Sequence, residues 1–349
     1  MINPMQLVQL CKGKKVYIQT HNFPDPDAIS SAFGLQKLLE HFGVESTICH
    51  EGQIDKLSSV KLLNLCDIEM YSYENIKENM SEEDMIILVD CQKNNGNTTD
   101  FIGNEVAAID HHPTVVEIDY QYFDLRIVGA CASIIADYYR ELKVEPDRKV
   151  ATALAYGIRM DTNQLSRGVT EFDINIFGFL YRYMDQQLIT KLENNNMELS
   201  DLKAYGAAID HISLVGKVGF SYMNFSCPDA LVAILSDFIL SIAEIEFVVI
   251  YAVRNNGYKF SVRSEHSNVH AGKLTTKALA PVGNGGGHAS MAGGFVEKKE
   301  IDLLKMDVFE NQGIEMTEDV TATKEETFGL VQNLFINVIQ QDYPELLED

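Results

Sequence analysis

Cysteine and long apolar runs are both scarce in this sequence of 349 residues. The 6 cysteines are scattered and form no Cys-x-x-Cys pair, which leaves no thiolate cluster for a structural zinc ion and favours free thiols over a disulfide scaffold. No uninterrupted apolar run approaches the roughly 20 residues of a membrane-spanning helix, and residues 1–19 lack the apolar stretch of a secretory leader. We therefore expect a soluble protein of a reducing compartment, the cytoplasm.

Positive charge is scarce as well. The chain has 28 Lys and Arg residues against 51 Asp and Glu residues, which gives a formal net charge of -23 at pH 7. An acidic surface repels polyanions at long range, which argues against a binder of long duplex DNA or of an anionic membrane. A small phosphorylated substrate is compatible with this charge, provided that a local cation attracts the phosphate.

The chain does have the composition of a globular protein with a core, 46% hydrophobic and 23% charged residues. Its length exceeds the roughly 100 to 200 residues of one domain, so the sequence predicts two domains. The polar segment 185–205 contains three successive asparagines and is the predicted linker. We therefore expect one domain at residues 1–184 and a smaller one at residues 206–349.

The first half of the chain alternates short apolar runs with helical patterns. Residues 15–20, 85–89 and 106–109 are β-rich, and residues 28–42 have apolar side chains at helical spacing. Continuous apolar strands are typical of a buried, mainly parallel sheet flanked by helices, so the predicted fold class is α/β. Ligands of open α/β sheets bind at the carboxyl ends of the strands. Those ends carry His21, Asp90, Asp110, His111 and His112.

The second half has the pattern of a smaller α/β domain. A helix is predicted at 230–243, and the runs 247–253 and 258–263 flank an Asn-Asn-Gly turn, which is a hairpin signal. A second predicted helix, at 270–279, leads into a glycine cluster at 283–287.

The acidic segment 317–349 is amphipathic, with Phe328, Val331, Phe335 and Val338 on one predicted helix face. We expect this face to pack on the second domain. The alternative is a contact in a homodimer.

Several polar side chains have simple structural explanations when each is taken alone. Asp27 lies in a proline-rich turn with His21 and Asp25, and it could cap the helix that follows. The neighbours His111 and His112 could be two surface histidines. Adjacent side chains of an extended segment point in opposite directions, so both reach one site only if the strand ends there and turns.

Asp90 and Asp161 each follow an apolar segment and would, alone, be ordinary loop residues. Taken together, however, the histidines and carboxylates form a mixed set that suits Mn²⁺ or Mg²⁺. Two divalent cations would neutralise the four carboxylates, and they could share a water molecule and hold it in line with a phosphorus atom. The candidate ligands are His21, Asp25, Asp27, Asp90, His111 and Asp161.

This arrangement of motifs resembles the DHH family of phosphoesterases that carry a C-terminal DHHA1 domain. The resemblance covers about residues 5 to 300 of the chain. Four metal motifs occur in family order: His21-x3-Asp25-x-Asp27, Asp90, Asp110-His111-His112 and Asp161-Thr162. The DHHA1 signature matches Gly285-Gly286-Gly287-His288, with Arg263 and Ser264 on the strand that faces it.

The resemblance implies a role for each of these residues. One metal ion would be bound by His21, Asp25 and Asp90, and the second by Asp27, Asp90, His111 and Asp161, with Asp90 bridging. The catalytic centre would also include Asp110, which orients its neighbours, and His112, which contacts a phosphate oxygen. The substrate would be bound from the second domain by Arg263, Ser264, Gly285, Gly286, Gly287 and His288. Taken alone, the glycines would be a flexible loop and Arg263 a solvated strand end.

The architecture narrows the function that this resemblance implies. The Gly-Gly-Gly-His run argues against family II inorganic pyrophosphatases, and the chain has no room for the OB domain of RecJ-like exonucleases. It also lacks the transmembrane segments of membrane-anchored cyclic-dinucleotide phosphodiesterases. The resemblance then implies a Mn²⁺-dependent hydrolase similar to nanoRNase/pAp phosphatases, with short RNA or pAp as substrate. The alternatives are hydrolysis of cyclic di-AMP or pApA, and a non-catalytic nucleotide-binding module.

Overall fold

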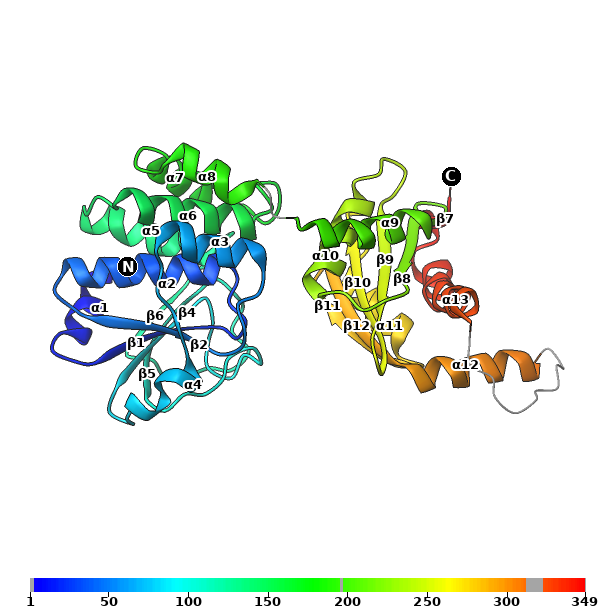
Figure 1. Ribbon diagram of the computed structural model, residues 1–349, viewed down its shortest axis with the longest axis horizontal. Helices are drawn as coiled ribbons and strands as arrows, with labels where there is room; N and C mark the ends of the chain where they lie inside the picture. The colour runs from blue at the N-terminus through cyan, green and yellow to red at the C-terminus, as the bar shows by residue number, and fades with distance from the viewer. Residues whose placement is uncertain (1–2, 195–196, 312–322, 349) are drawn as a thin grey trace. The chain divides into compact units, whose positions relative to one another are not determined.

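The structure, a computed structural model, describes residues 3–194, 197–311 and 323–348. The chain divides into two compact units, Met1–Met197 and Glu198–Asp349. Each unit contains a six-stranded sheet with helices packed against it (Figure 1). The predicted α/β fold class is therefore confirmed.

The first unit is built on a fully parallel sheet with the strand order β3-β2-β1-β4-β5-β6. Its strands are β1 (Val16–Thr20), β2 (Ser46–His50), β3 (Tyr71–Ser72), β4 (Met85–Val89), β5 (Asn104–Asp110) and β6 (Tyr122–Leu125). From β1 the chain proceeds toward one edge of the sheet, and from β4 it proceeds toward the other. The adjacent strands β1 and β4 therefore form a topological switch point, the place where open α/β sheets bind their ligands.

Most helices of the first unit cover one face of this sheet (Figure 1). They are α1 (Pro4–Cys11), α2 (Pro26–His41), α3 (Leu57–Cys66), α5 (Cys131–Leu142), α6 (Arg148–Asp161), α7 (Glu171–Leu180) and α8 (Gln186–Glu193). Helix α2 is buried along most of its length because it contacts both the sheet and helices α5 and α6. An added Cβ at Gly34 would lie 2.9 Å from Leu154 Cδ2, so glycine permits this close approach of α2 and α6.

The other face of the first sheet carries a smaller apolar cluster. Tyr17, Ile86 and Leu88 point to this side and pack with Phe101 and with Ile76 of the short helix α4 (Tyr73–Ile76). A single 3-10 turn follows α4. Because the strands are covered on both faces, the apolar runs that predicted them are continuous rather than alternating.

The second unit has a mixed sheet with the strand order β11-β12-β10-β9-β8-β7, in which only the pair β8–β9 is parallel. Its strands are β7 (Ser213–Val215), β8 (Val218–Met223), β9 (Phe247–Val253), β10 (Gly257–Ser264), β11 (Gly283–Gly287) and β12 (Met291–Glu297). Strands β9 and β10 form the hairpin that the Asn-Asn-Gly turn predicts. Two short 3-10 helices, Leu199–Asp201 and Pro344–Leu347, lie near the ends of this unit.

Helices cover both faces of the second sheet. Helices α9 (Leu202–Asp210) and α10 (Asp229–Leu240) pack on one face, and α11 (Ala271–Leu279) and α13 (Lys324–Asp342) pack on the other. Helix α12 (Lys298–Asn311) follows β12.

Two predictions about the second half can now be compared with the structure. The glycine cluster is the strand β11, paired with β12, so the explanation of it as a flexible loop is wrong. Helix α13 buries Val331, Phe335 and Val338 in the core of the second unit, which confirms the expected packing. Residues 317–322 of the predicted amphipathic segment lie outside the described residues.

The predicted linker, 185–205, contains ordered structure that belongs to both units. Helix α8 buries Ile189 and Leu192 in the first unit, and the division between the units falls after Met197. Over the residues that the structure describes, no helix combines the length and apolar character needed to cross a membrane.

Candidate metal centre

The predicted ligands come together at the carboxyl edge of the first sheet, beside the switch point. His21 follows β1, Asp90 follows β4, and His111 follows β5. The other carboxylates come from helices, with Asp25 and Asp27 at the start of α2 and Asp161 as the last residue of α6.

These side chains form two groups that share Asp90. His21 Nε2 lies 3.9 Å from Asp25 Oδ1 and 3.6 Å from Asp90 Oδ2. His111 Nε2 lies 3.3 Å from Asp90 Oδ1, and the same nitrogen lies 3.4 Å from Asp161 Oδ2. The two oxygens of Asp90 therefore face different histidines, an arrangement suited to a bridging ligand.

Helix N-termini position the two aspartates of the proline-rich turn. Asp25 is the N-cap of α2, where its Oδ1 accepts hydrogen bonds from the backbone N–H groups of Asp27 (2.9 Å) and Ala28 (3.1 Å). Asp27 accepts from Cys131 N (2.7 Å) and Ala132 N (2.9 Å), which are donors of the first turn of α5. The explanation of Asp27 as the cap of its own helix is therefore wrong. Its carboxylate is fixed from a neighbouring helix.

Asp90 has a backbone conformation that is uncommon for a non-glycine residue. Its φ is +60°, in the left-handed region, and its N–H donates to Ile109 O (2.9 Å) at the end of the neighbouring strand. Strained residues of this kind gather at functional sites. The turn places the Asp90 carboxylate over the switch point.

The histidines present their Nε2 atoms to the carboxylates. His21 Nδ1 lies 2.9 Å from Asn22 O, and His111 Nδ1 lies 3.0 Å from Val128 O. Because a carbonyl oxygen only accepts hydrogen bonds, each Nδ1 carries a proton that it donates. This contact fixes the ring and leaves Nε2 to act as a metal ligand.

Asp110 organises the two histidines that follow it. Its buried Oδ1 accepts from His111 N (2.8 Å), His112 N (3.2 Å) and His112 Nδ1 (2.9 Å). Gln92 Nε2 donates to Asp110 Oδ2 (2.7 Å) and to His112 O (3.0 Å). The strand therefore does end at Asp110 and turn, so that neighbouring histidines both face the cluster.

Several groups of the cluster have shifted pKa values. Burial, with the charges of Asp90 and Asp161, raises the pKa of Asp27 well above its usual range. Burial and Asp90 raise the pKa of Asp161 to about 6. Burial alone would lower the pKa of His111, but the negative charges of Asp90, Asp27 and Asp161 outweigh it and raise that pKa to about 11. The same balance between burial and nearby carboxylates raises the pKa of His21 to about 9.

The donor set fits divalent cations that prefer oxygen and imidazole ligands. Asp90 Oδ1 and His111 Nε2 are both buried, and their mutual geometry is not that of a hydrogen bond. Buried polar atoms without a hydrogen-bond partner are uncommon, and metal coordination would satisfy both of these. The nearby thiols Cys91 and Cys131 contact backbone carbonyls, and burial raises their pKa, so the site offers no thiolate.

Two residues that support this centre could not be identified from the sequence pattern alone. One is Gln92, because its contact with Asp110 depends on how two strands end side by side. The other is Asp173, which is buried and accepts from Gly129 N (2.8 Å) and Ser133 Oγ (2.6 Å). It holds the loop that contacts His111. The only sequence signal for Asp173 is its capping-box spacing from Thr170 at the start of α7.

Two of the predicted substrate residues of the second unit, Arg263 and Ser264, already have hydrogen-bond partners. Arg263, near the end of β10, donates from Nε to Asp237 Oδ1 (2.6 Å) and from Nη1 to Val262 O (3.1 Å). Ser264 Oγ donates to Val269 O (3.1 Å). The explanation of Arg263 as a solvated strand end is wrong, since the residue is buried. His288 follows β11 and is exposed.

The glycines of β11 differ in the space around them. An added Cβ at Gly283 would lie 2.4 Å from Phe295 O, and one at Gly285 would lie 2.8 Å from Thr275 Cγ2 of α11. At Gly286 the nearest atom, Thr276 Oγ1, is 3.7 Å away. Close packing of β11 therefore requires some of these glycines, whereas a Cβ at Gly286 would make only an ordinary van der Waals contact.

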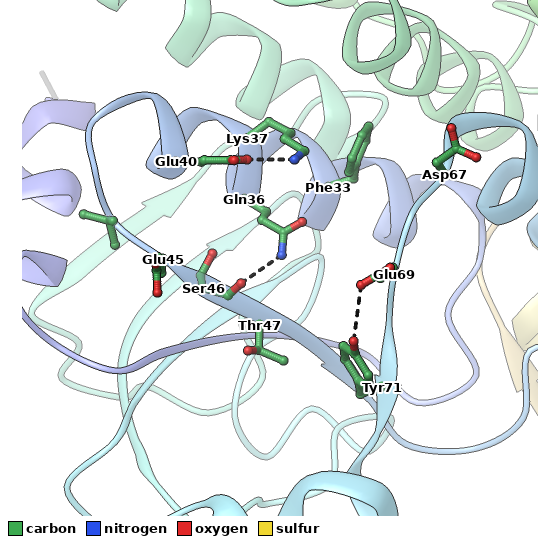
Figure 2. A pocket seen from close by; sticks show the side chains of 11 residues that line it. Phe33, Gln36, Lys37, Glu40, Glu45, Ser46, Thr47, Asp67, Glu69 and Tyr71 are labelled. Atoms are coloured by element: carbon green, nitrogen blue, oxygen red, sulfur yellow. Dashed lines mark hydrogen bonds and ion pairs between the residues drawn. The ribbon is translucent and has the colours of Figure 1, made fainter.

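A separate hollow of the first unit lies away from the predicted ligands. It has a volume of about 460 Å³ and lies at the amino end of β2, as Figure 2 shows. Its polar side chains largely bond to one another: Lys37 pairs with Glu40 (2.7 Å), and Tyr71 donates to Glu69 (3.3 Å). None of the candidate metal ligands lines it.

Comparison with protein families gives two matches along the chain. Residues 15–158 match the model described as "DHH family, N-terminal domain", and residues 216–311 match the "DHHA1 domain". The first match contains five of the six candidate ligands, all but Asp161, and the second contains the glycine strand β11.

Individual proteins resemble the chain over most of its length. An uncharacterized protein of Methanocaldococcus jannaschii is 30% identical over 284 residues, 80% of this chain and 58% of the relative, so the chain spans less than two thirds of that protein. A probable manganese-dependent inorganic pyrophosphatase of Streptococcus thermophilus is 24% identical over 259 residues, 70% of this chain and 79% of the relative. The crystal structure of an exopolyphosphatase-related protein from Bacteroides fragilis has the same fold, with a TM-score of 0.71 at 16% identity, covering 99% of this chain and 96% of that one.

Proposed function

We propose that this chain, which matches the DHH family N-terminal domain over residues 15–158 and the DHHA1 domain over residues 216–311, is a metal-dependent phosphoesterase acting on short oligoribonucleotides or pAp-type nucleotides. The observation that carries the proposal is the pair of ligand groups that share Asp90 at the switch point. Coordination of metal ions would satisfy buried Asp90 Oδ1 and His111 Nε2, which have no hydrogen-bond partner.

Two divalent ions would be held by the candidate ligands. His21, Asp25 and Asp90 form one set, and Asp27, His111 and Asp161 form the other, with Asp90 in reach of both. Bound there, the ions supply a water of lowered pKa and positive charge for the phosphate. We propose Mn²⁺ first and Mg²⁺ second, in keeping with the oxygen-rich ligands and with the manganese dependence named for the Streptococcus thermophilus relative.

His112 would contact a phosphate oxygen of the substrate. Its side chain is half exposed, and its Nδ1 lies 2.9 Å from Asp110 Oδ1. The hydrogen bond with Asp110 raises the pKa of His112, which favours the protonated ring. A protonated ring held at Nδ1 can donate from Nε2 to an anionic oxygen. Asp110 and Gln92 fix the position of this donor.

The second unit would bind the rest of the substrate through Arg263, Ser264, His288 and the glycines 285–287. Arg263 carries a planar guanidinium that suits phosphate recognition. The net charge of -23 disfavours long nucleic acids, so short substrates fit the chain best. We place the activity in the cytoplasm, in keeping with six cysteines that are all free thiols.

Release of phosphate and nucleotide by the purified protein tests this function. The panel is pAp, pApA, a three-nucleotide RNA, cyclic di-AMP and inorganic pyrophosphate, each with Mn²⁺ and with or without EDTA. We expect EDTA-sensitive hydrolysis with the highest kcat/KM on pAp or the short RNA. Preference for cyclic di-AMP or pyrophosphate would reassign the substrate. Nucleotide binding without any hydrolysis would make the chain a binding module instead.

A further inference from the structure

Phe23 is an exposed aromatic residue inside the loop that carries candidate metal ligands. It lies two residues after His21 and two before Asp25, and it is 64% exposed. Single exposed apolar side chains are common on proteins, so exposure alone shows little. Two further features of Phe23 point to a role.

The first feature is the backbone of Phe23. Its φ is +56°, and a bulky residue in the left-handed region is an outlier that the surroundings must stabilise. Its N–H donates to Glu51 O (2.8 Å), and Asn22 N donates to Asn97 O (2.7 Å). The Asn22 side chain bonds to both Oγ1 (3.0 Å) and the backbone N–H (3.2 Å) of Thr99. The loop is thus fixed from two neighbouring loops.

The second feature is the packing of the aromatic ring of Phe23 against Gly52. An added Cβ at Gly52 would lie 2.5 Å from Phe23 Cδ1, so the ring lies directly against the backbone of the loop that follows β2. Gly52 itself has a φ of +82°, which favours glycine there. The ring is therefore held in place although most of the residue faces solvent.

We propose that Phe23 is a stacking platform for a nucleobase of the substrate, a subsite beside the metal centre that rests on the proposed nucleotide function. Residues two apart have Cα atoms within about 7 Å of each other, so the backbone of Phe23 adjoins that of His21 and Asp25, two of the residues that would hold the metal ions. In a nucleotide, one sugar separates the base from the phosphate. A base on Phe23 and a phosphate at the candidate metal centre would be neighbours in the same way. Aromatic rings that face solvent stack on bases of any sequence.

Fluorescence tests the platform without requiring catalysis. The chain contains no tryptophan, so Phe23→Trp introduces a single reporter at the proposed site. We expect AMP with Mg²⁺ to quench or shift its emission, and ribose 5-phosphate with Mg²⁺, which has no base, to leave it unchanged. The matched control is Tyr181→Trp at the end of α7, another exposed aromatic position, where neither compound should act. Equal responses to both compounds at position 23, or no response to AMP, would overturn the platform.

Kinetics give a second readout. Phe23→Ala should raise KM for pApA by about 5- to 150-fold, the factor that corresponds to loss of one base stack, while kcat changes little. Phe23→Tyr should retain the wild-type KM, and Tyr181→Ala should have no effect. Unchanged KM in Phe23→Ala would contradict the platform while leaving the phosphoesterase proposal intact. If no substrate is hydrolysed at all, that proposal fails, and the fluorescence response still decides whether Phe23 binds a base.

Discussion

The two sets of predicted functional side chains differ in how their polar groups are paired. At the carboxyl edge of the first sheet, Asp90 Oδ1 and His111 Nε2 are buried without a hydrogen bond, and Asp27 and Asp161 have raised pKa values. In the second unit, by contrast, Arg263 donates hydrogen bonds to Asp237 and to the backbone.

This difference indicates two kinds of binding. Cations that replace the protons of the carboxylate cluster would stabilise its negative charges. The cluster is therefore suited to bind metal ions before any substrate binds. To bind a phosphate, Arg263 would have to give up a carboxylate, so its contribution to substrate binding would be the difference between the two partners. Substitutions in the first set should abolish turnover, whereas substitutions in the second should mainly change KM.

The largest effect should come from Asp90→Asn, which removes the shared ligand. We expect kcat/KM to fall by more than about 100-fold, since loss of even an outer partner of a metal ligand costs about 10- to 100-fold. The matched control is Asp84→Asn, a buried aspartate just before β4, whereas Asp90 comes just after it. Asp84 pairs with Lys15 at the other end of the strand and should leave activity near the wild-type value. Equal kcat/KM in Asp90→Asn and wild type would rule out the shared-ligand assignment.

Metal removal should make stability depend on pH through His21. Its pKa in the folded protein is about 9, above the ordinary value of 6.5. The stability that protonation contributes is therefore fully present below pH 6.5 and is lost as the pH rises through 9. In EDTA we expect Tm to fall by on the order of 5 °C over this range, and by much less with Mg²⁺, which requires the neutral ring.

Circular dichroism at several pH values, with and without Mg²⁺, measures this dependence. His21→Asn is the control, because it should make the profile recorded in EDTA less steep; the raised pKa of His111 accounts for the slope that remains. Parallel profiles with and without Mg²⁺ would show that the cation does not replace the proton at His21.

The side chains of the candidate metal centre are the part of the molecule whose proximity the sequence predicts best. Apolar strands end directly at His21, Asp90 and Asp110, and parallel strands bring their carboxyl ends to one edge. The sequence predicts Asp27 as the N-cap of α2, whereas the structure has Asp25 there, because a cap depends on backbone dihedrals that the residue types do not determine.

Contacts between residues far apart in the sequence could not be predicted in the same way. Gln92 acts on Asp110 across two strand ends, and nothing in its neighbours along the chain marks that contact. The glycines of β11 are compatible with a loop when taken alone, and they become a strand through pairing with β12 and packing on α11. Tertiary contacts overrode local preference there.

A smaller effect is expected in the second unit from Arg263→Ala. Charge-assisted hydrogen bonds contribute about 1.5–3 kcal/mol, so KM should rise by about 10- to 100-fold with kcat nearly unchanged. Arg254→Ala is the matched control, because Arg254 follows β9 of the same hairpin and pairs with Asp229. A large fall in kcat with constant KM would contradict a binding role for Arg263, and equal effects of both variants would indicate a structural one.

The smallest effects are expected from alanine substitutions of two adjacent glycines of β11, which should differ from each other. An added Cβ at Gly286 would lie 3.7 Å from Thr276 Oγ1, an ordinary van der Waals contact, so Gly286→Ala should fold with the wild-type Tm and raise KM a few-fold if substrate approaches this backbone. Gly285→Ala would place its methyl group 2.8 Å from Thr275 Cγ2 and should lower the free energy of unfolding by about 1–3 kcal/mol. Thermal unfolding and steady-state kinetics of both variants measure the two effects. An unchanged KM in Gly286→Ala would mean that β11 has glycine for packing alone, and would remove this strand from the proposed substrate site.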